Sequence, residues 1–294
     1  MDIALEAWGA DYPRVEEACR FAEASGLDGF TYGESPHGLN LECWSVLAAL
    51  ARVTHRIRLG PVIANVLPEY RSPLLLARQA EAVSAIAPGR VELRTGVGAA
   101  AGHARPWWNP HGIGYPSYDR RLADLEEALA TWDRRWDGAG VDIPITVAAT
   151  GERAMALAAR HARSWETSFC TPTEYVRRRT RFASIAARVA PGRTVTGSLE
   201  VDAFVATTRA GVDAVLAAAG AERGRGEDLG PVFDRALVGT PDRIAADLAA
   251  LARAGVDRVL VAPHDPLDLD AIAALADAGR LVRGGPAGTT GPAG

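Results

Sequence analysis

The stretch Tyr70–Gly98, YRSPLLLARQAEAVSAIAPGRVELRTGVG, decides the fold. Arg-Ser-Pro opens a run whose apolar residues repeat with helical spacing, and the run breaks at Pro88-Gly89. A short strand pattern follows over Val91–Thr95 and ends in Gly96-Val97-Gly98. A helix that leads through a tight turn into a buried strand is the repeating unit of a parallel α/β protein.

The same unit recurs along the whole chain. The eight predicted strands are Ile3–Trp8, Gly29–Tyr32, Ile57–Asn65, Val91–Thr95, Ile145–Ala148, Trp165–Ser168, Val195–Ala206 and Val259–Ala262. Helical patterns separate them, and residues 210–230 read as a helical insertion between the seventh strand and the seventh helix. Eight strand–helix pairs predict a single (β/α)8 TIM barrel. A doubly wound sheet is the competing architecture, but no GxGxxG follows the first strand.

Two further segments complete the predicted organisation. Residues 96–116, rich in Gly, Trp and Pro, are predicted as a long loop after the fourth strand. The barrel domain is predicted over residues 1–282, and residues 283–294 are predicted as a disordered Gly/Pro-rich tail.

Composition excludes several classes of function. The net charge is −4, which gives no electrostatic basis for binding nucleic acid or an anionic membrane. All 32 basic residues are arginine, so a Schiff-base lysine and a Walker-type phosphate loop are both excluded. The 3 cysteines have no paired spacing, and we predict neither a disulfide framework nor a metal site. No secretory pattern begins the sequence, so a cytoplasmic location is expected.

Four segments carry a resemblance to a known family. They read WSVLAALARVTHRIRLG, the following GPVIANVLPEYRSPLLLARQAEAVSAIAPGRVELRTGVG, VAATGERAMALAARHARSWETS and VGTPDRIAADLAALARAGVDRVLV. In this order the chain resembles the bacterial luciferase-like flavin-dependent oxidoreductases. The resemblance implies a barrel that binds FMN, or in one branch a deazaflavin, with the ring across the strand ends.

The resemblance also implies where the cofactor would lie. Thr95 and Gly96 end the fourth strand, where small residues let the backbone approach a flat ring. Ala64 and Asn65 end the third strand, where the family often has a cis peptide bond between residues other than proline. Arg121 matches a family position that often contacts the phosphate.

A phosphate also needs donors from the backbone in a protein without lysine. Thr150-Gly151 lies between a strand and a helix, where the first helical N–H groups can hold an anion. Simple capping of that helix by Thr150 is the alternative.

The residues that would carry chemistry come from two regions. Glu34 matches an acidic family position, but Ser35 follows it where the family often has histidine, and His37 comes two positions later. We predict Glu34 and His37 as catalytic, with an exposed loop histidine as the alternative for His37.

The predicted substrate pocket contains Trp8, Trp107, Trp108 and His111. Adjacent tryptophans indicate a substrate wall, a subunit contact or packing against the outer helices.

These features predict an FMN-dependent monooxygenase that acts on a small organic substrate with dioxygen and reduced flavin. No nicotinamide fingerprint is present, so a separate flavin reductase is expected as a partner. A deazaflavin-dependent hydride-transfer enzyme is the closest alternative, and a flavin-binding protein without turnover is the alternative of another class. A homodimer is expected.

Overall fold

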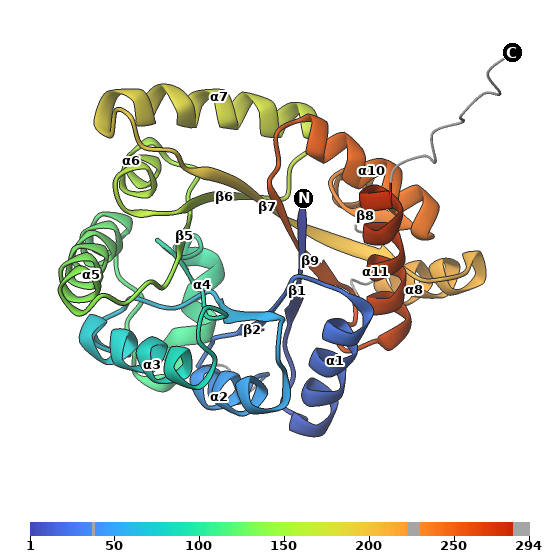
Figure 1. The fold of residues 1–294 in the computed structure, drawn as a ribbon, viewed down its shortest axis with the longest axis horizontal. Helices are drawn as coiled ribbons and strands as arrows, with labels where there is room; N and C mark the ends of the chain where they lie inside the picture. The colour runs from blue at the N-terminus through green and yellow to red at the C-terminus, as the bar shows by residue number, and fades with distance from the viewer. Residues whose placement is uncertain (37–38, 223–229, 285–294) are drawn as a thin grey trace, which may run out of the picture.

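The computed structural model describes residues 1–36, 39–222 and 230–284. Within them, eight parallel strands form a nearly closed barrel surrounded by helices, which confirms the predicted (β/α)8 architecture (Figure 1). The barrel strands are β1 (Asp2–Ala7), β2 (Gly29–Gly33), β3 (Arg58–Val62), β4 (Leu93–Gly96), β5 (Ile145–Ala148), β6 (Ser164–Ser168), β7 (Thr196–Val205) and β9 (Arg258–Pro263). The helices are α1 (Tyr12–Ser25), α2 (Cys43–Val53), α3 (Pro73–Ile86), α4 (Ala101–Trp108), α5 (Tyr118–Ala139), α6 (Glu152–His161), α7 (Pro172–Val189), α8 (Arg209–Glu222), α9 (Gly230–Phe233), α10 (Pro241–Arg253) and α11 (Leu269–Gly284).

The strands follow one another around the barrel in the order β3-β2-β1-β9-β7-β6-β5-β4. The ring closes between β3 and β4 through two isolated bridges, Leu59 with Val91 and Ala64 with Thr95. Because all strands run in parallel, their C-terminal ends meet at one end of the barrel, where barrel enzymes place their sites. No helix in the described part of the chain is long and apolar enough to cross a membrane.

Local chemistry explains why the segment 70–98 folds as it does. The Ser72 hydroxyl accepts a hydrogen bond from the backbone N–H of Leu75 at 3.2 Å, and Pro73 occupies the first turn of α3. Serine before proline is therefore a helix start, because the hydroxyl satisfies a free N–H group and proline needs none. Gly89 adopts a φ of 73° in the turn that leads to β4.

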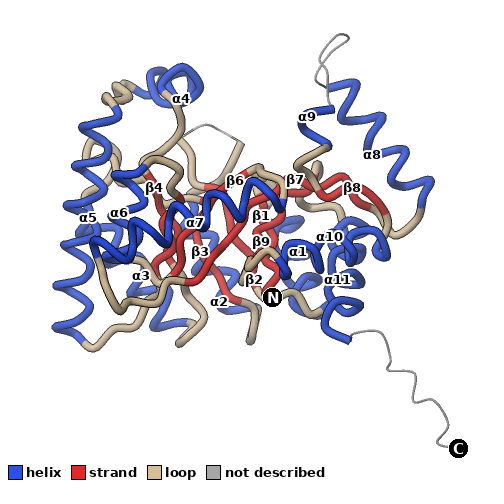
Figure 2. The backbone as a smooth tube through the Cα atoms, turned by 90° about the horizontal axis from the view of Figure 1, so that it is seen from above, coloured by secondary structure: helices blue, strands red, loops and turns tan. Residues whose placement is uncertain are grey.

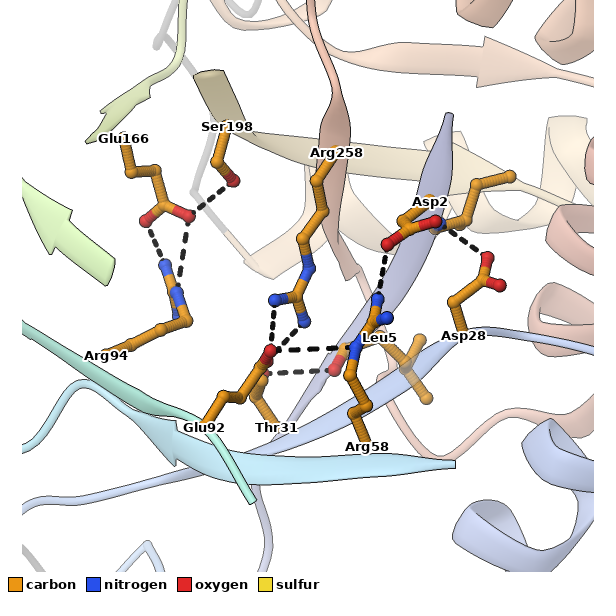
Figure 3. A network of polar contacts seen from close by, with 11 residues as sticks. Asp2, Leu5, Asp28, Thr31, Arg58, Glu92, Arg94, Glu166, Ser198 and Arg258 are labelled. Carbon is orange, nitrogen blue, oxygen red and sulfur yellow. Dashed lines mark hydrogen bonds and ion pairs between the residues drawn. The ribbon is translucent and has the colours of Figure 1, made fainter. Parts of the chain in front are cut away.

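Alternate residues of the strands point into the barrel, and many of them are charged. Arg258 of β9 pairs with Glu92, one residue before β4, although β9 and β4 lie on opposite sides of the ring (Figure 3). This pair must therefore cross the barrel interior. Arg58 of β3 lies 3.7 Å from Glu92 and 2.5 Å from Asp2. Side chains alternate along a strand, so residues of the same parity also face inward, among them Glu6, Arg94, Glu166, Ser198 and Glu200.

The apolar residues between these inward positions face the helices and form the main core. Ile3, for example, packs against α11 close to Gly279. The core thus lies between sheet and helices, while the interior of the barrel holds a polar network.

The region after β4 differs from the sequence prediction. Residues 96–116 were predicted as a loop, but they contain α4 and a short 3-10 turn, Asn109–His111. In Figure 2, α4 lies beyond the end of β4, on the side of the barrel where α5 lies. This helix therefore contributes to whatever site lies there.

The C-terminal third differs in two smaller ways. A three-residue strand that was not predicted, β8 (Leu237–Gly239), pairs with β7 outside the ring. Helix α11 continues to Gly284, so Arg283 is helical and lies 3.4 Å from Asp28. Residues 223–229 of the predicted insertion and residues 285–294 of the predicted tail lie outside the described residues.

Candidate active site

A cavity of about 490 Å³ opens at the C-terminal ends of the barrel strands, a size in the ordinary range for small-molecule sites. Seven of the predicted site residues line it: Glu34, Asn65, Gly96, Trp107, Trp108, Thr150 and Gly151. The lining has three parts of different chemistry, which we call the small-residue wall (Gly96–Ala99, Ala148 and Ala149), the aromatic wall (Trp107, Trp108 and Tyr115) and the carboxylate floor (Glu6, Glu166 and Glu200).

The small-residue wall is formed by the ends of β4 and β5. A Cβ atom at Gly96 would lie 3.0 Å from the carbonyl oxygen of Ala148 and 3.4 Å from the Ile63 side chain. Gly98 has a φ of 82°, and a Cβ there would overlap the hydroxyl of Tyr115. Both glycines are thus also required by the chain itself, and together they leave a flat stretch of backbone at the cavity.

Arg121 of α5 lies behind this wall and holds it in place. Its guanidinium donates hydrogen bonds to the carbonyl oxygens of Val97 at 2.9 Å, Pro116 at 2.6 Å and Ala99 at 3.2 Å. It also lies over the Tyr115 ring, 4.3 Å from the ring centre, and it is buried. In this structure Arg121 therefore shapes the loop after β4, and its contact with a phosphate stays a prediction.

The first turn of α6 faces the cavity from the end of β5. Gly151 is the N-cap residue, and no side chain of the described residues accepts a hydrogen bond from the first N–H groups of the helix. Thr150 does not cap the helix, so the capping alternative from the sequence is not what the structure contains. Thr150, Gly151 and Ala154 all line the cavity, and this helix start can therefore offer free N–H groups to an anion there.

The aromatic wall comes from α4 and the segment that follows it. Trp108 is buried and stacks on Tyr115, with ring centres 6.5 Å apart, and it meets Tyr70 edge to face at 5.2 Å. Trp107 is 40% exposed and contacts His103 at 4.7 Å. One tryptophan is thus anchored in a small core, while the other remains available to a ligand.

Glu34, at the end of β2, is held by a buried ion pair. Arg71 lies 2.5 Å from one carboxylate oxygen and donates to the other at 2.7 Å, and the backbone N–H of Asn65 donates at 2.6 Å. The Asn65 side chain donates in turn to the carbonyl oxygen of Glu34 at 3.0 Å. Glu34 therefore ties β2 to the segment after β3, and Arg71 is a site residue that the sequence analysis did not name.

The carboxylate floor lies over the barrel centre. Glu166 of β6 is paired with Arg94 of β4, whose Nε lies 3.2 Å from Glu166 Oε2, and it accepts from Ser198 at 2.8 Å (Figure 3). Glu200 of β7 accepts from Ser168 at 2.9 Å and lies 3.8 Å from Arg94. Glu6 of β1 lines the cavity, and its buried Oε2 has no hydrogen-bond partner in the part of the chain that the structure describes.

The surroundings raise the pKa of both Glu6 and Glu200, the two carboxyls of the floor that have fewer partners. Burial raises the pKa of Glu6 well above its ordinary value, and the neighbouring carboxylate of Glu200 raises it further against the opposing effect of Arg94. Burial likewise raises the pKa of Glu200, while Arg94 opposes that rise. Carboxyl groups whose pKa is raised by burial and by neighbouring charges are typical of functional sites.

Comparison of the sequence with known protein families shows to which family the chain belongs. The sequence model of the luciferase-like monooxygenases matches residues 3–258. The chain belongs to the luciferase-like monooxygenase family. Among curated protein sequences, none matches it significantly.

Solved structures of similar fold include enzymes with different cofactors. An F420-dependent secondary alcohol dehydrogenase, in complex with an F420-acetone adduct, is 13% identical with a TM-score of 0.78, over 94% of this chain and 97% of that one. The coenzyme F420 dependent tetrahydromethanopterin reductase of Methanopyrus kandleri is 17% identical with a TM-score of 0.75, over 94% and 97%. The oxygenating constituent of 3,6-diketocamphane monooxygenase of Pseudomonas putida, in complex with FMN, is 17% identical with a TM-score of 0.71, over 94% and 96%.

The remaining predicted residues that the structure describes in this luciferase-like protein lie outside the cavity lining. Thr95 donates from its hydroxyl to the carbonyl oxygen of Ala64 at 3.0 Å, and both residues join β3 to β4 behind the lining. The peptide bond Val62–Ile63, within the segment predicted from the family, is cis. Trp8 and the exposed His111 do not line the cavity, and His37 lies outside the described residues.

A signal for the carboxylate floor was present in the sequence of this family member. Ser164, Glu166 and Ser168 are spaced by two along one strand, and Ser198, Glu200 and Asp202 repeat the pattern along another. In strands whose other face is apolar, polar residues of one parity must share a face. In a barrel that face is the interior, so the pattern could have located the floor.

Proposed function

We propose that this protein is an FMN-dependent monooxygenase that binds the flavin ring against the small-residue wall. The observation that supports it most is the position of the uncapped first turn of α6 beside that wall, in one cavity. Bound FMN requires two features: a flat surface for its ring and, at one end of that surface, an anion site for its phosphate.

The residues present fit such a cofactor in other respects. Arg153 lies in the first turn of α6 and is exposed. Its guanidinium pairs with Asp119 of α5 at 2.5 Å. The chain lacks lysine, so backbone N–H groups and arginine are the donors that remain for a phosphate. Bound there, reduced flavin would supply electrons for the reaction of dioxygen with an organic substrate.

The chain's own residues would orient the substrate and exclude water. Trp107, Trp108 and Ala104 form an apolar surface opposite the carboxylate floor, and apolar walls displace water from a reacting centre. We further propose that a separate reductase supplies reduced flavin and that the enzyme is a homodimer.

A deazaflavin-dependent hydride-transfer enzyme is the second candidate, and the carboxylate floor favours it. Oxygen chemistry on reduced flavin requires a dry site, whereas Glu6 and Glu200 are polar groups that burial drives toward the protonated state. Hydride transfer does not involve oxygen and is compatible with polar groups at the base of the cavity. The same cavity, with acidic groups at its base, argues against the third candidate, a flavin-binding protein without turnover.

The identity of the cofactor is tested by titration of the purified protein with FMN, riboflavin and a deazaflavin, followed by absorbance and flavin fluorescence. We expect FMN to bind more tightly than riboflavin, because only FMN carries the phosphate. Tighter binding of the deazaflavin would select the second candidate. Absence of binding by all three would overturn the proposal.

The phosphate site is tested by Glu152→Pro with Glu152→Ala as its matched control. Proline fits the first position of a helix and removes one N–H group, and Gly151 already has the extended backbone that precedes proline. We expect Glu152→Pro to weaken FMN binding while riboflavin binding and Glu152→Ala remain close to wild type. Equal affinities of both variants for FMN would place the phosphate elsewhere.

A further inference from the structure

The carboxylate floor holds more acidic groups than the described basic residue beside it can neutralise. Glu6, Glu166, Glu200 and Asp202 act electrostatically on one another, and Arg94 is the cation that acts on Glu6 and Glu200. Two of the nitrogen donors of Arg94 bind Glu166, while its Nη1 is buried without a hydrogen-bond partner among the described residues. Glu200 lies 3.8 Å from Arg94, and Oε2 of Glu6 has no hydrogen-bond partner among the described residues.

The position of these groups makes the imbalance accessible to a ligand. Glu6 and Glu200 both line the cavity, and the buried Oε2 of Glu6 has no hydrogen-bond partner among the described residues. A buried charged oxygen without a partner is unfavourable unless a proton or a cation occupies it. In the free protein burial favours a proton on this carboxyl, and in a complex a ligand can take its place.

We propose that Glu6 and Glu200 recognise a positively charged nitrogen, so that the substrate of this enzyme is an organic amine with an apolar body. This inference rests on the proposed function, since it names the class of substrate for that cavity. The floor would bind the ammonium group, and the aromatic wall would contact the apolar part. A substrate of this kind satisfies both surfaces of the cavity at once.

Binding of the amine would be coupled to release of a proton. The ligand enters as an ammonium ion, the O–H bond of a protonated Glu6 or Glu200 carboxyl breaks, and the proton passes to the buffer. The carboxylate left behind accepts hydrogen bonds from the ammonium, which are stronger than those between neutral groups. Affinity should therefore rise with pH as these carboxyls ionise.

A metal ion is a less suitable occupant. No group of three or more His, Cys, Asp or Glu side chains in the described part of the chain is arranged to hold one. Arg94 is a fixed cation close to Glu166 and Glu200, and it would repel a divalent metal ion more strongly than a singly charged ammonium group.

The test uses phenethylamine and its neutral counterpart phenethyl alcohol, which have the same shape and differ in charge. Calorimetric titration of the full chain, with and without FMN, gives both affinities and the number of protons released when two buffers are compared. We expect the amine to bind at least about tenfold more tightly than the alcohol, and Glu6→Gln to abolish this preference. Glu69→Gln, which removes an exposed carboxylate paired with Arg120 away from the cavity lining, is the matched control.

Each result has one meaning. An amine that binds no more tightly than the alcohol, or that releases no proton, would overturn the inference, and so would a preference that survives both Glu6→Gln and Glu200→Gln. The wild-type pH dependence provides a check that needs no variant, because only the amine should gain affinity as pH rises. Binding of FMN is measured separately, so a failed cofactor site and a failed amine site give distinguishable results.

Discussion

At the scale of single residues, two glutamates at one cavity show how surroundings assign roles. Glu34 is paired with Arg71 through both carboxylate oxygens and accepts a hydrogen bond from the backbone N–H of Asn65, so it positions the chain around the cavity. Glu6 faces the same cavity, and its Oε2 has no hydrogen-bond partner among the described residues. A carboxylate held by a buried cation supports the structure, whereas one without such a cation is available to a ligand or a proton.

The first prediction concerns Arg71→Ala. This change leaves Glu34 buried without its cation, and the loss of one partner of a buried pair costs about 3–5 kcal/mol. Chemical denaturation should show a loss of that size. Arg78→Ala removes a 66% exposed partner of Glu81 in the same helix and should cost less than about 1 kcal/mol. Similar costs for both variants would mean that the Glu34 pair does not stabilise the fold.

The second prediction concerns the pH dependence of Glu6→Gln. Burial raises the pKa of Glu6 in the folded state, so its contribution to stability is complete below the unfolded pKa and is lost as pH rises through the folded pKa. Glutamine mimics the protonated form at every pH. The variant should be more stable than wild type at about pH 8, by more than the ~0.5 kcal/mol expected of surface changes.

Near about pH 4 this difference should disappear, because Glu6 is then protonated in both states. Denaturation curves at three pH values, with Glu69→Gln as control, check the trend. A difference that is constant with pH would show that Glu6 keeps an ordinary pKa.

At the scale of elements, the segment from β4 to α5 decides the shape of the cavity. Tyr115 donates to the carbonyl oxygen of Ala99 at 2.9 Å, and Arg121 binds the carbonyl oxygens on either side of Gly98. These contacts fix a stretch of backbone that has few side chains of its own. The loop is therefore organised from behind by α5.

The third prediction separates two roles of Arg121. If Arg121 only shapes the loop, Arg121→Ala should weaken the binding of FMN and of riboflavin by similar factors, since both rings would contact the same small-residue wall. If it reaches a phosphate, only FMN should be affected. We expect the first outcome, from the three carbonyl contacts of the guanidinium. Arg120→Ala, at the exposed neighbour that pairs with Asp124, should leave both affinities unchanged.

The elements show which parts of a barrel are readable from sequence. All eight barrel strands were predictable, because strand patterns alternate with segments of helical periodicity along the chain. Helix α4 was missed because it contains Gly102 and Pro106, which have low helix propensity, and its conformation depends on the packing of Trp108. Strand β8 has three residues, too few for a periodic pattern.

The residues of the candidate site could also be predicted from the sequence in part. Seven predicted residues line the cavity because strand ends in a parallel barrel converge wherever they come in the sequence. The roles of Arg71 and Arg121 depend on partners 37 and 24 positions away, and such pairings leave no local pattern. The carboxylate floor corresponds to polar residues spaced by two along two strands. This spacing locates the floor only once the strands are known to form a barrel.

At the scale of the whole molecule, the barrel interior has two polar levels. Toward the N-terminal ends of the strands, Glu92, Arg258, Arg58 and Asp2 link three strands and the start of β4 (Figure 3). Burial alone would raise the pKa of Glu92, but Arg258 and then Arg58 lower it below its ordinary value. The lower level is thus balanced in charge, and the upper level has an acidic excess.

The fourth prediction is that Glu92→Gln destabilises the whole barrel. A lowered folded pKa contributes stability above the unfolded pKa and loses it as pH falls through the folded value. The variant should lose about 3–5 kcal/mol at neutral pH, because Arg258 is left in the interior without its partner. The loss should shrink in acid. Glu127→Gln, on the exposed face of α5, is the control, and an equal effect of both would refute the role of the crossing pair.

The arrangement of the tryptophans has an optical consequence. Of the 7 in the chain, Trp107 and Trp108 line the cavity, while Trp132 and Trp136 stack on each other in α5 away from it. A bound flavin absorbs light in the range where tryptophan emits, so it would quench the nearest indoles most strongly. The aromatic wall thus gives the enzyme an intrinsic fluorescent reporter of cavity occupancy, readable without any added label.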